Sequence, residues 1–488
     1  MITLPSTPRQ AFIAGKFKDA LSGQTIATVN PATGQEIASF AACNTADVDE
    51  AVAAARAAFE AGTWSREAPA ERKRVLLKFA DLLEGRLDDI AALDCLEGGK
   101  PITETREGDV AQTIACFRWY AELVDKIYDR VAPTPSDILG MIVREPIGVA
   151  GAVLPWNFPA LMFAWKVAPA LASGTSIIVK PAEQTSLSAL LMAQLAAEAG
   201  IPDGVLSVLP GYGHEAGEAM GRHNGIDLVS FTGSTEVGRY FLRYSAESNL
   251  KRIVLECGGK SPQLVLADAP ALDVMIDDVL AAAFWNMGEN CSCGSRLIVH
   301  RSRKDELVDG IKNGLAQWKI GNPQDADTKL GPMIEPGHLE KVMGYIEAGK
   351  EEGAQIVTGG TRILEETGGY FVAPTILGDV TNSMSVAREE IFGPVLSTIV
   401  FDDEDEGIKI ANETDYGLAA SVWTESLDKA VKASRAIKAG TVSVNCFSEG
   451  DDTTPFGGFK QSGFGGKDKG VEALDQYTEL KTIWIKTR

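Results

Sequence analysis

The chain has 488 residues, more than a single hydrophobic core accommodates, so two or three domains are expected. Hydrophobic residues make up 45% and charged residues 23% of the sequence, as in ordinary globular proteins. The formal net charge of −21, from 46 Lys and Arg against 67 Asp and Glu, argues against a nucleic-acid partner and against binding to an anionic membrane surface.

The cysteines and histidines predict neither a disulfide framework nor a metal site. The seven cysteines are odd in number and scattered, without a CxxC pair, and the four histidines form no cluster with the spacing of zinc ligands. The N-terminus lacks a basic segment followed by an apolar one, and prolines interrupt the longest apolar region, 146–173. We therefore expect a cytoplasmic protein without a metal, a secretory signal or a membrane span.

The first 150 residues divide into three stretches. Residues 1–45 indicate short strands and turns, with a clear turn at 30–34. Apolar residues then recur at helical spacing in four runs, at 46–62, 68–85, 87–96 and 106–128. Prolines and glycines punctuate 130–150, and 141–145 has an extended pattern, which predicts a ribbon that leaves the body of the domain.

Between 150 and 270 a pattern of strand, turn and helix repeats. Strands are expected at 176–179, 205–209, 227–231 and 253–255. Helices are expected at 186–199, where the pattern is amphipathic, at 214–222 and from 235 onward. This alternation predicts a parallel sheet with helices on both faces, whose ligands bind beyond the carboxyl ends of the strands.

The same alternation continues from 259 to 445. Helices are expected at 271–286, 303–317, 336–353, 404–412 and 427–438. Strands are expected at 296–299, 397–401, 419–422 and 442–444. Residues 478–485 alternate as an edge strand would, and they can pair with 141–145 of their own or of another subunit.

Two of the predicted strand ends carry residues suited to a dinucleotide, although neither common phosphate-loop motif is present. The turn 231–238 lies between a strand and a helix, where glycines and free N–H groups can hold a phosphate; the alternative is a plain structural turn. Lys180 and Glu183 follow another strand and can bind ribose hydroxyls, which favours NAD over NADP; the alternative is a surface ion pair.

Three further residues are candidates for the chemistry. Asn157 lies between bulky residues with a proline on either side, so its amide is rigidly aimed and can bind an oxyanion, or it merely ties down a turn. Glu256 ends a strand beside two glycines and is suited to act as a general base, unless it is a solvated loop carboxylate. Cys291 lies in a small, polar, Gly-flanked loop and is a candidate nucleophile, although most cysteines are inert core residues.

The sequence resembles the aldehyde dehydrogenase superfamily from about residue 25 to its C-terminus. Seven segments carry the resemblance in this order: PWNFP at 155–159, KPAEQT at 180–185, FTGSTEVG at 231–238, ECGGK at 256–260, GENC at 288–291, EEIFGP at 389–394 and PFGG at 455–458. Any one of these motifs is weak evidence, whereas seven in order identify the chain as a member of the superfamily.

The resemblance implies an α/β fold with three parts. A Rossmann-like NAD-binding domain is expected from 1–129 and 147–257, and an α/β catalytic domain from 258–461. A small β oligomerisation ribbon, 130–146, with a strand at 475–488, is expected to build a homodimer or a homotetramer.

The resemblance also assigns the chemistry residue by residue. Cys291 attacks the aldehyde to form a thiohemiacetal, its pKa lowered by the site, while Cys293 is only its neighbour. The Asn157 amide and the Cys291 N–H bind the oxyanion. After hydride transfer leaves a thioester, Glu256 activates the water that releases a carboxylic acid, and Lys166 relays protons.

The expected cofactor is NAD, with NADP as the weaker alternative. Its contacts by resemblance are Trp156, Lys180, Glu183, Gly217, Gly233, Ser234, Gly238, Gly258, Glu390 and Phe392. The substrate contacts by resemblance are Phe158, Met162, Trp165, Asn290, Ser292 and the loop before Pro455.

That loop, 447–454, holds three carboxylates where several relatives place an aromatic residue. Glu449 and Asp451 make an acidic mouth that favours a cationic tail, unless the charges are merely solvated. The loop and the GENCS segment look most like bacterial dehydrogenases of polyamine and arginine breakdown, which take 4-guanidinobutyraldehyde, 4-aminobutyraldehyde or its γ-glutamyl derivative.

The leading hypothesis is an NAD-dependent, hydrolytic dehydrogenase for an ω-amino or ω-guanidino aldehyde. A general aliphatic or aromatic aldehyde dehydrogenase is the second. A CoA-acylating enzyme is the third, against which Glu256 argues, and a non-catalytic binding protein of the same fold is the fourth.

Overall fold

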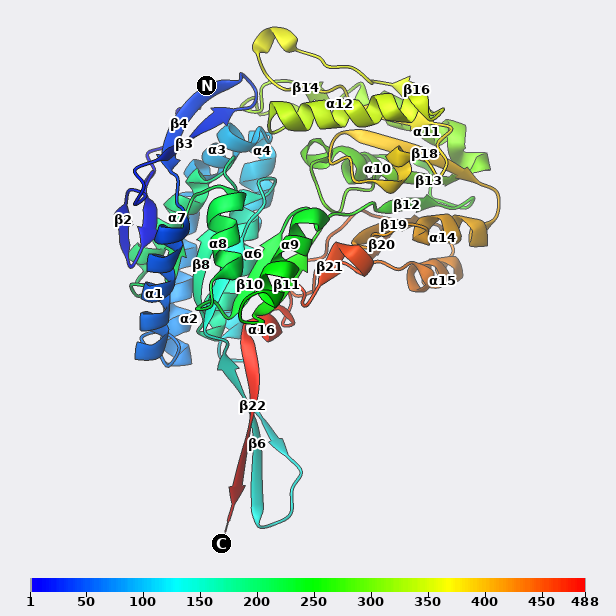
Figure 1. The fold of residues 1–488 in the computed structure, drawn as a ribbon. Coiled ribbons are helices and arrows are strands. Elements are labelled where there is room, and N and C mark those ends of the chain that lie inside the picture. Colours follow the sequence, from blue (N-terminus) through cyan, green and yellow to red (C-terminus); the bar gives the residue numbers. More distant parts are fainter. Residues whose placement is uncertain (1, 488) are drawn as a thin grey trace.

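The computed structural model describes residues 2–487 and contains two large sheets, each covered by its own helices (Figure 1). The first sheet with its helices, called the first layer below, has eight strands. The strand order is β2-β1-β9-β8-β7-β10-β11-β21. Five central strands are parallel: β7 (Val149–Val153), β8 (Ser176–Lys180), β9 (Leu206–Val208), β10 (Leu228–Thr232) and β11 (Arg252–Glu256). Short antiparallel strands finish the edges: β1 (Ala11–Ile13), β2 (Lys16–Lys18) and β21 (Gly463–Phe464). The predicted parallel sheet is therefore confirmed.

Helices cover both faces of this sheet because its strands are apolar on both sides. In β8, Ile177 and Val179 join one core cluster, whereas Ile178 joins another on the opposite face. The first cluster is built with α2 (Pro69–Glu84), α3 (Leu87–Gly98), α5 (Ala111–Leu123), α6 (Pro159–Ser173) and α7 (Leu187–Ala199). The second is built with α1 (Thr45–Ala61), α8 (Glu218–Arg222) and α9 (Thr235–Ala246).

Helix α7 corrects one expectation. Its sequence was expected to form an amphipathic helix, yet only Ala197 and Glu198 are exposed along it, because it packs against α2, α3 and the sheet. The missing polar face reflects burial on several sides rather than a surface position.

The second layer is a seven-stranded sheet with the order β16-β17-β18-β13-β12-β19-β20. Its strands are β12 (Pro262–Val265), β13 (Arg296–His300), β16 (Gln355–Thr358), β17 (Thr375–Gly378), β18 (Val395–Phe401), β19 (Ala419–Trp423) and β20 (Thr441–Val444). Its helices are α10 (Leu272–Phe284), α11 (Lys304–Leu315), α12 (Pro336–Glu351), α13 (Ser385–Arg388), α14 (Glu404–Asn412) and α15 (Leu427–Ala436). The strands β12, β16 and β17 had not been expected. The residue boundary expected at 257 and 258 falls between β11 and β12, which belong to different sheets.

A three-stranded sheet projects from the body of the molecule (Figure 1). It contains β5 (Arg130–Ala132), β6 (Ile138–Pro146) and β22 (Thr478–Lys486). β22 pairs with β6 of the same chain, from Thr478 opposite Pro146 to Lys486 opposite Ile138. The pairing of the last strand with the ribbon is thus confirmed within one chain.

The remaining elements are short. They are β3 (Thr25–Asn30), β4 (Gln35–Ala41), α4 (Ile102–Glu104), β14 (Lys319–Ile320), β15 (Thr328–Leu330) and α16 (Ala473–Gln476). Within residues 2–487, no helix has the length and apolar character needed to cross a membrane.

Candidate active site

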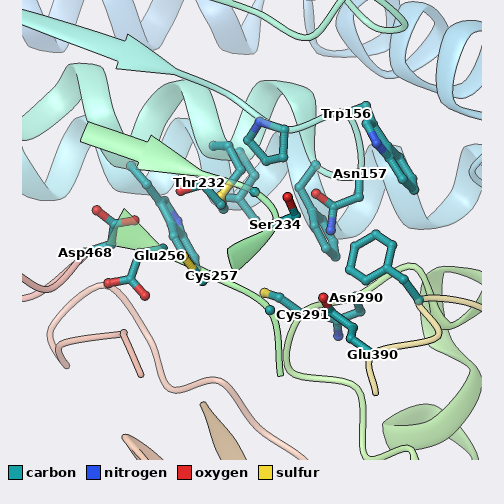
Figure 2. A pocket seen from close by; sticks show the side chains of 18 of the residues that line it. Trp156, Asn157, Thr232, Ser234, Glu256, Cys257, Asn290, Cys291, Glu390 and Asp468 are labelled. Atoms are coloured by element: carbon teal, nitrogen blue, oxygen red, sulfur yellow. The ribbon is translucent and has the colours of Figure 1, made fainter. Parts of the chain in front are cut away.

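A cavity of about 210 Å³ opens where the carboxyl ends of β7, β10 and β11 meet loops from the second layer. Figure 2 shows its lining side chains, with Cys291 directed into the cavity and Glu256 and Asn157 on different sides of it. Fourteen of the residues expected from the sequence line the cavity: Trp156, Asn157, Phe158, Met162, Trp165, Gly233, Ser234, Glu256, Gly258, Asn290, Cys291, Glu390, Phe392 and Glu449. Its position agrees with the rule that ligands bind at the carboxyl ends of parallel strands.

Asn157 precedes α6 and is tied to the loop that carries the cysteine. Its Nδ2 donates to the backbone oxygen of Glu289 at 2.9 Å, and Asn286 Nδ2 donates to the backbone oxygen of Asn157 at 3.1 Å. Asp94 of α3 fixes the start of α6 by accepting from the Ala160 N–H at 3.2 Å. An amide has two N–H donors, so Asn157 both ties down this turn and keeps one donor for a ligand.

A sharp turn after α10 positions Cys291. Asn286, Met287 and Gly288 have φ of 50°, 57° and 70°, a left-handed run that is costly for the two non-glycine residues. A Cβ on Gly288 would meet Gly393 O at 2.3 Å, and one on Gly259 would meet Cys291 O at 2.3 Å. Backbone packing on two sides therefore holds the cysteine in place.

The pKa of Cys291 corrects an expectation. Burial raises the pKa of its thiol well above the usual value, and the carboxylates of Glu449, Glu390 and Glu256 raise it further. The sequence had predicted a lowered pKa. These carboxylates disfavour a further negative charge on the sulfur, and hence the thiolate form of Cys291.

Cys293 is buried away from the cavity. Its Sγ donates to the backbone oxygen of Ala283 at 3.3 Å, and it does not line the cavity. Cys291 is therefore the thiol of this pair that a ligand can reach.

Glu256 lies at the end of β11 with a side chain that is 3% exposed and without a protein hydrogen bond on either oxygen. Burial and the neighbouring Asp468 raise its pKa well above the usual value, while Lys166 and Lys467 oppose that shift. A Cβ on Gly457, whose φ is 150°, would meet Glu256 Oε1 at 2.3 Å, so only glycine leaves room for the carboxyl.

Lys166 lies outside the cavity and contacts one of the residues that line it. Its buried Nζ contacts Asp468 Oδ2 at 2.6 Å, and Asp468 lines the cavity whereas Lys166 does not. The contact that the structure shows for Lys166 is with Asp468, a residue of the cavity that sequence reasoning had missed.

The residues that suit a dinucleotide extend along the edge of the first sheet. Lys180 Nζ donates to Glu183 Oε2 at 3.0 Å and to Gly211 O at 2.8 Å. Ser234 begins α9, and its Oγ accepts from the Val237 N–H at 3.3 Å. Thr232 has a buried hydroxyl without a protein partner in the cavity, and open space surrounds Gly213. Free polar groups at strand ends, a helix N-terminus and uncovered glycine backbone fit a bound NAD.

Four expected cofactor contacts do not line the cavity: Lys180, Glu183, Gly217 and Gly238. Gly217 begins the short α8 region, where a Cβ would come within 3.7 Å of the Lys180 side chain. A Cβ on Gly238 would instead meet Cys257 Sγ at 3.1 Å, so this glycine lets α9 approach β11 closely.

Glu390 and Phe392 close the cavity from the second layer. Glu390 Oε1 accepts from the Gly259 N–H at 3.0 Å, and a Cβ on Gly258 would meet Glu390 Oε2 at 2.0 Å. Burial raises the pKa of Glu390 to about 7. Phe392 packs edge-on against Trp156, with ring centroids 5.3 Å apart.

His338 and Lys341, which sequence reasoning had missed, also line the cavity. His338 contacts both Trp156 and Phe392, and its Nε2 lies 2.6 Å from Phe392 O. Burial lowers its pKa to about 4, so the ring is neutral near pH 7. The sequence offered one signal for this pair: His338 and Lys341 are three residues apart on the helix predicted at 336–353, so both lie on the same face of it.

Aromatic rings and one carboxylate form the far side of the cavity. Trp165 packs against Phe456 at 5.1 Å between ring centroids, and Phe158 packs against Trp285 at 5.2 Å. Glu449, from the acidic loop 447–454, reaches the cavity and accepts a hydrogen bond from Ser292 Oγ.

Two expected substrate contacts do not reach the cavity. Asp451 is exposed and accepts from the Thr453 N–H and hydroxyl within its own loop. Ser292 is buried outside the cavity, and its hydroxyl donates to Asn290 Oδ1 at 3.1 Å and to the Glu449 carboxylate, both of which belong to cavity residues. The loop folds back at Asp451, which sequence spacing could not reveal.

Comparisons with known proteins agree with this site. The family described as "Aldehyde dehydrogenase family" matches residues 17–483. An aminoacetaldehyde dehydrogenase of Pseudomonas aeruginosa is 55% identical over 98% of this chain and 96% of its own length. The crystal structure of a gamma-glutamyl-gamma-aminobutyraldehyde dehydrogenase from Burkholderia cenocepacia has a TM-score of 0.97 and 49% identity over 99% of this chain and 98% of that chain. An indole-3-acetaldehyde dehydrogenase of P. syringae in complex with NAD+ has a TM-score of 0.97 and 49% identity over 99% and 97% of the two chains.

Proposed function

The chain belongs to the aldehyde dehydrogenase family, and from that premise we propose that its preferred substrates are aldehydes with an ω-amino or ω-guanidino tail. It is an NAD-dependent oxidoreductase that converts an aldehyde to a carboxylic acid. The observation that carries the substrate proposal is the Glu449 carboxylate, which shares one small cavity with Cys291. The names of an aminoacetaldehyde and a gamma-glutamyl-gamma-aminobutyraldehyde dehydrogenase among its relatives support the same class.

In the proposed mechanism Cys291 forms the first bond. The Cys291 thiol first gives its proton to water; the thiolate then adds to the carbonyl carbon, a C–S bond forms, and the π electron pair moves onto oxygen to give the thiohemiacetal oxyanion. The free N–H of Asn157 Nδ2 and the backbone N–H of Cys291 are the proposed donors to that oxyanion, since Asn157 and Cys291 line the same cavity. Bound NAD supplies the hydride acceptor.

The same residues release the product. Glu256 takes a proton from water, whose oxygen attacks the thioester on Cys291; the C–S bond breaks, and the acid leaves. The raised pKa of Glu256 suits a base that must hold a proton near neutral pH. Lys166 and Asp468, in contact at 2.6 Å beside it, provide a route by which this proton leaves the cavity.

The proposed cofactor contacts follow the sheet edge. Lys180 and Glu183 hold the adenosine ribose, and the turn with Gly233 and Ser234 holds the pyrophosphate. Glu390 and Phe392 frame the nicotinamide end together with Trp156, Gly258 and His338. The Glu183 carboxylate favours a free ribose hydroxyl, and hence NAD over NADP.

Assembly and location complete the proposal. The projecting sheet exposes Val131, Leu480 and Trp484, with Trp484 60% exposed, and we propose that it joins subunits into a homodimer or homotetramer. The seven cysteines are all free within the described chain, as suits a cytoplasmic protein. We also propose that the ribbon 130–146 and the strand 475–488 serve this assembly, beside an NAD-binding domain ending at 257 and a catalytic domain at 258–461.

A substrate panel tests the proposal. NADH formation is measured with 4-guanidinobutyraldehyde, 4-aminobutyraldehyde, its γ-glutamyl derivative, betaine aldehyde and hexanal. We expect the cationic aldehydes to lead in kcat/KM by about tenfold or more, roughly 1.4 kcal/mol of discrimination. Equal or faster turnover of hexanal would leave the general aldehyde dehydrogenase as the correct assignment, and acyl-CoA formation on addition of CoA would identify an acylating enzyme.

A further inference from the structure

A buried lysine lies beneath the acidic loop, outside the set of residues that line the cavity. Lys469 is 3% exposed, and its Nζ donates to the backbone oxygens of Glu449 at 2.8 Å and Gly450 at 3.3 Å. The same Nζ lies 4.9 Å from the ring centroid of Trp165 and 5.6 Å from that of Phe456. One ammonium thus joins the acidic loop to two aromatic walls of the cavity.

The backbone around Lys469 is unusual for a lysine. Its φ is 57°, in the left-handed region that glycine and asparagine adopt more readily, and the next residue, Gly470, has φ of 62°. A long side chain kept at a left-handed position indicates that its contacts compensate for the backbone cost. This observation is independent of the hydrogen bonds that the side chain makes.

The segment 468–470 supports the acidic loop along its length. Asp468 and Phe456 exchange backbone hydrogen bonds at 2.6 and 2.8 Å, and Gly470 N–H donates to Asp452 O at 3.0 Å. Between these two attachments, the Lys469 ammonium is the group that holds the tip at Glu449 and Gly450. The Glu449 carboxylate itself accepts from Ser292 Oγ, and Ser443 Oγ holds the preceding residue by donating to Ser448 O at 3.0 Å.

Two carboxylates of the acidic loop, Glu449 and Asp452, lie near the Lys469 ammonium and favour its charged form. Burial lowers the pKa of Lys469, and the carboxylates of Glu449 and Asp452 oppose that shift. The ammonium bonds to the backbone of the loop and not to the Glu449 carboxylate, which lines the cavity.

We propose that Lys469 is a positioning residue for substrate selectivity: it holds the backbone of the acidic loop so that the Glu449 carboxylate faces the amine of the aldehyde. This inference rests on the proposed function, because it needs Glu449 to recognise a cationic tail. It predicts that Lys469 affects the binding of amino aldehydes and leaves the chemical step on Cys291 unchanged.

The test compares 4-aminobutyraldehyde with pentanal, which replaces the ammonium by a methyl group at the same chain length. The measured quantity is the ratio of kcat/KM for the two aldehydes. In Lys469→Met we expect KM for 4-aminobutyraldehyde to rise about tenfold or more, with kcat for both aldehydes and KM for pentanal within about twofold of the wild type. Lys469→Arg, which keeps the charge and the donors, should restore most of the ratio.

Two results would overturn the inference. A lower KM for 4-aminobutyraldehyde in Lys469→Met would mean that the lysine only neutralises Glu449. An equal loss for both aldehydes in Lys469→Met, not restored in Lys469→Arg, would mean that it supports the fold in general.

Glu449→Gln, measured beside them, separates this inference from the proposed function. If Glu449→Gln abolishes the ratio and Lys469→Met leaves it intact, only the role of Lys469 is wrong. If Glu449→Gln leaves the ratio intact, amine recognition by the acidic loop is wrong as well. If each variant abolishes the ratio and the double variant adds no further loss, the two residues act as one unit, as proposed.

Discussion

Two walls of the cavity are built in different ways. The buried wall, formed by Asn157, Glu256 and Cys291, is fixed by strand ends, a left-handed turn and glycines that leave no room for a side chain. The acidic loop, 447–454, is half exposed and is held by the side chains of Ser292, Ser443 and Lys469. The difference teaches that the reaction and the choice of substrate are separable: changes in the buried wall should slow every aldehyde, and changes in the loop should slow only some.

The largest effect is expected at the nucleophile. Cys291→Ala removes the sulfur that bonds to the aldehyde, and kcat should fall at least about 10⁴-fold for every substrate, the scale seen when a covalent nucleophile is lost. Cys293→Ala is the matched control, because that thiol is buried and bonded to Ala283 O, and it should stay within about threefold. The reverse order of effects would move the nucleophile to Cys293. Steady-state NADH formation measures both.

The next effect separates two steps within the buried wall. Glu256→Gln keeps the size of the side chain but cannot take a proton, so turnover should fall by about 10²–10⁴-fold. Thioester formation does not need this base for water, so a first burst of NADH, close to one per active site, should remain. Stopped-flow absorbance measures it, and a loss of the burst itself would place Glu256 in the earlier step.

Asn157→Ala tests the oxyanion contact. Removing the Nδ2 donor should lower kcat by about 10²–10³-fold, or roughly 2.7–4 kcal/mol of barrier, for cationic and neutral aldehydes alike. The side chain also ties the turn to Glu289 O, so thermal unfolding is measured in parallel. A drop in kcat that follows only the fraction of unfolded protein would contradict the catalytic role.

In the acidic loop the effect should be smaller and selective. Glu449→Gln should lower kcat/KM for 4-aminobutyraldehyde by about tenfold and leave hexanal nearly unchanged, since it removes one partly solvated charge contact. Asp451→Asn is the matched control: this carboxylate is exposed and outside the cavity, so both substrates should stay within about twofold. A uniform loss from Glu449→Gln would break the distinction between the two walls.

The smallest effect is a shift in pH dependence. Glu256 works as a base only when deprotonated, and its pKa is raised, so the rate of thioester hydrolysis should increase with pH along an alkaline limb. Asp468 raises that pKa and Lys166 lowers it, so Asp468→Asn should move this rise in rate to lower pH and Lys166→Met should move it to higher pH. Shifts in the same direction would mean that the two residues do not act through Glu256.

Part of the site could be predicted from the sequence because two of its residues follow predicted strands of one parallel sheet. Ser234 and Glu256 come just after β10 and β11, whose ends meet at one edge, whereas Asn157 was predicted from its flanking prolines and not from β7, which had not been expected. The resemblance added Glu390 and Phe392 and strengthened the case for Cys291, and all three line the cavity.

Other features depended on long-range packing that no local pattern records. His338 comes from α12 of the second layer, and Asp468 and Lys469 come from a segment that pairs with the acidic loop. The raised pKa of Cys291 arises from the same source, because it depends on burial and on which carboxylates the folded chain brings near the sulfur. Strands β7, β12, β16 and β17 were missed, and β12 begins at a proline, which weakens a strand pattern.

The most direct test of the account is to trap the bond to Cys291. Glu256→Gln is mixed with hexanal and NAD, quenched in acid and mapped by peptide mass spectrometry. The account predicts one hexanoyl group on the peptide that contains Cys291, lost in Cys291→Ala and kept in Cys293→Ala. A hexanoyl group on Cys293 or Cys257, or NADH formed without any acyl group on the protein, would contradict it.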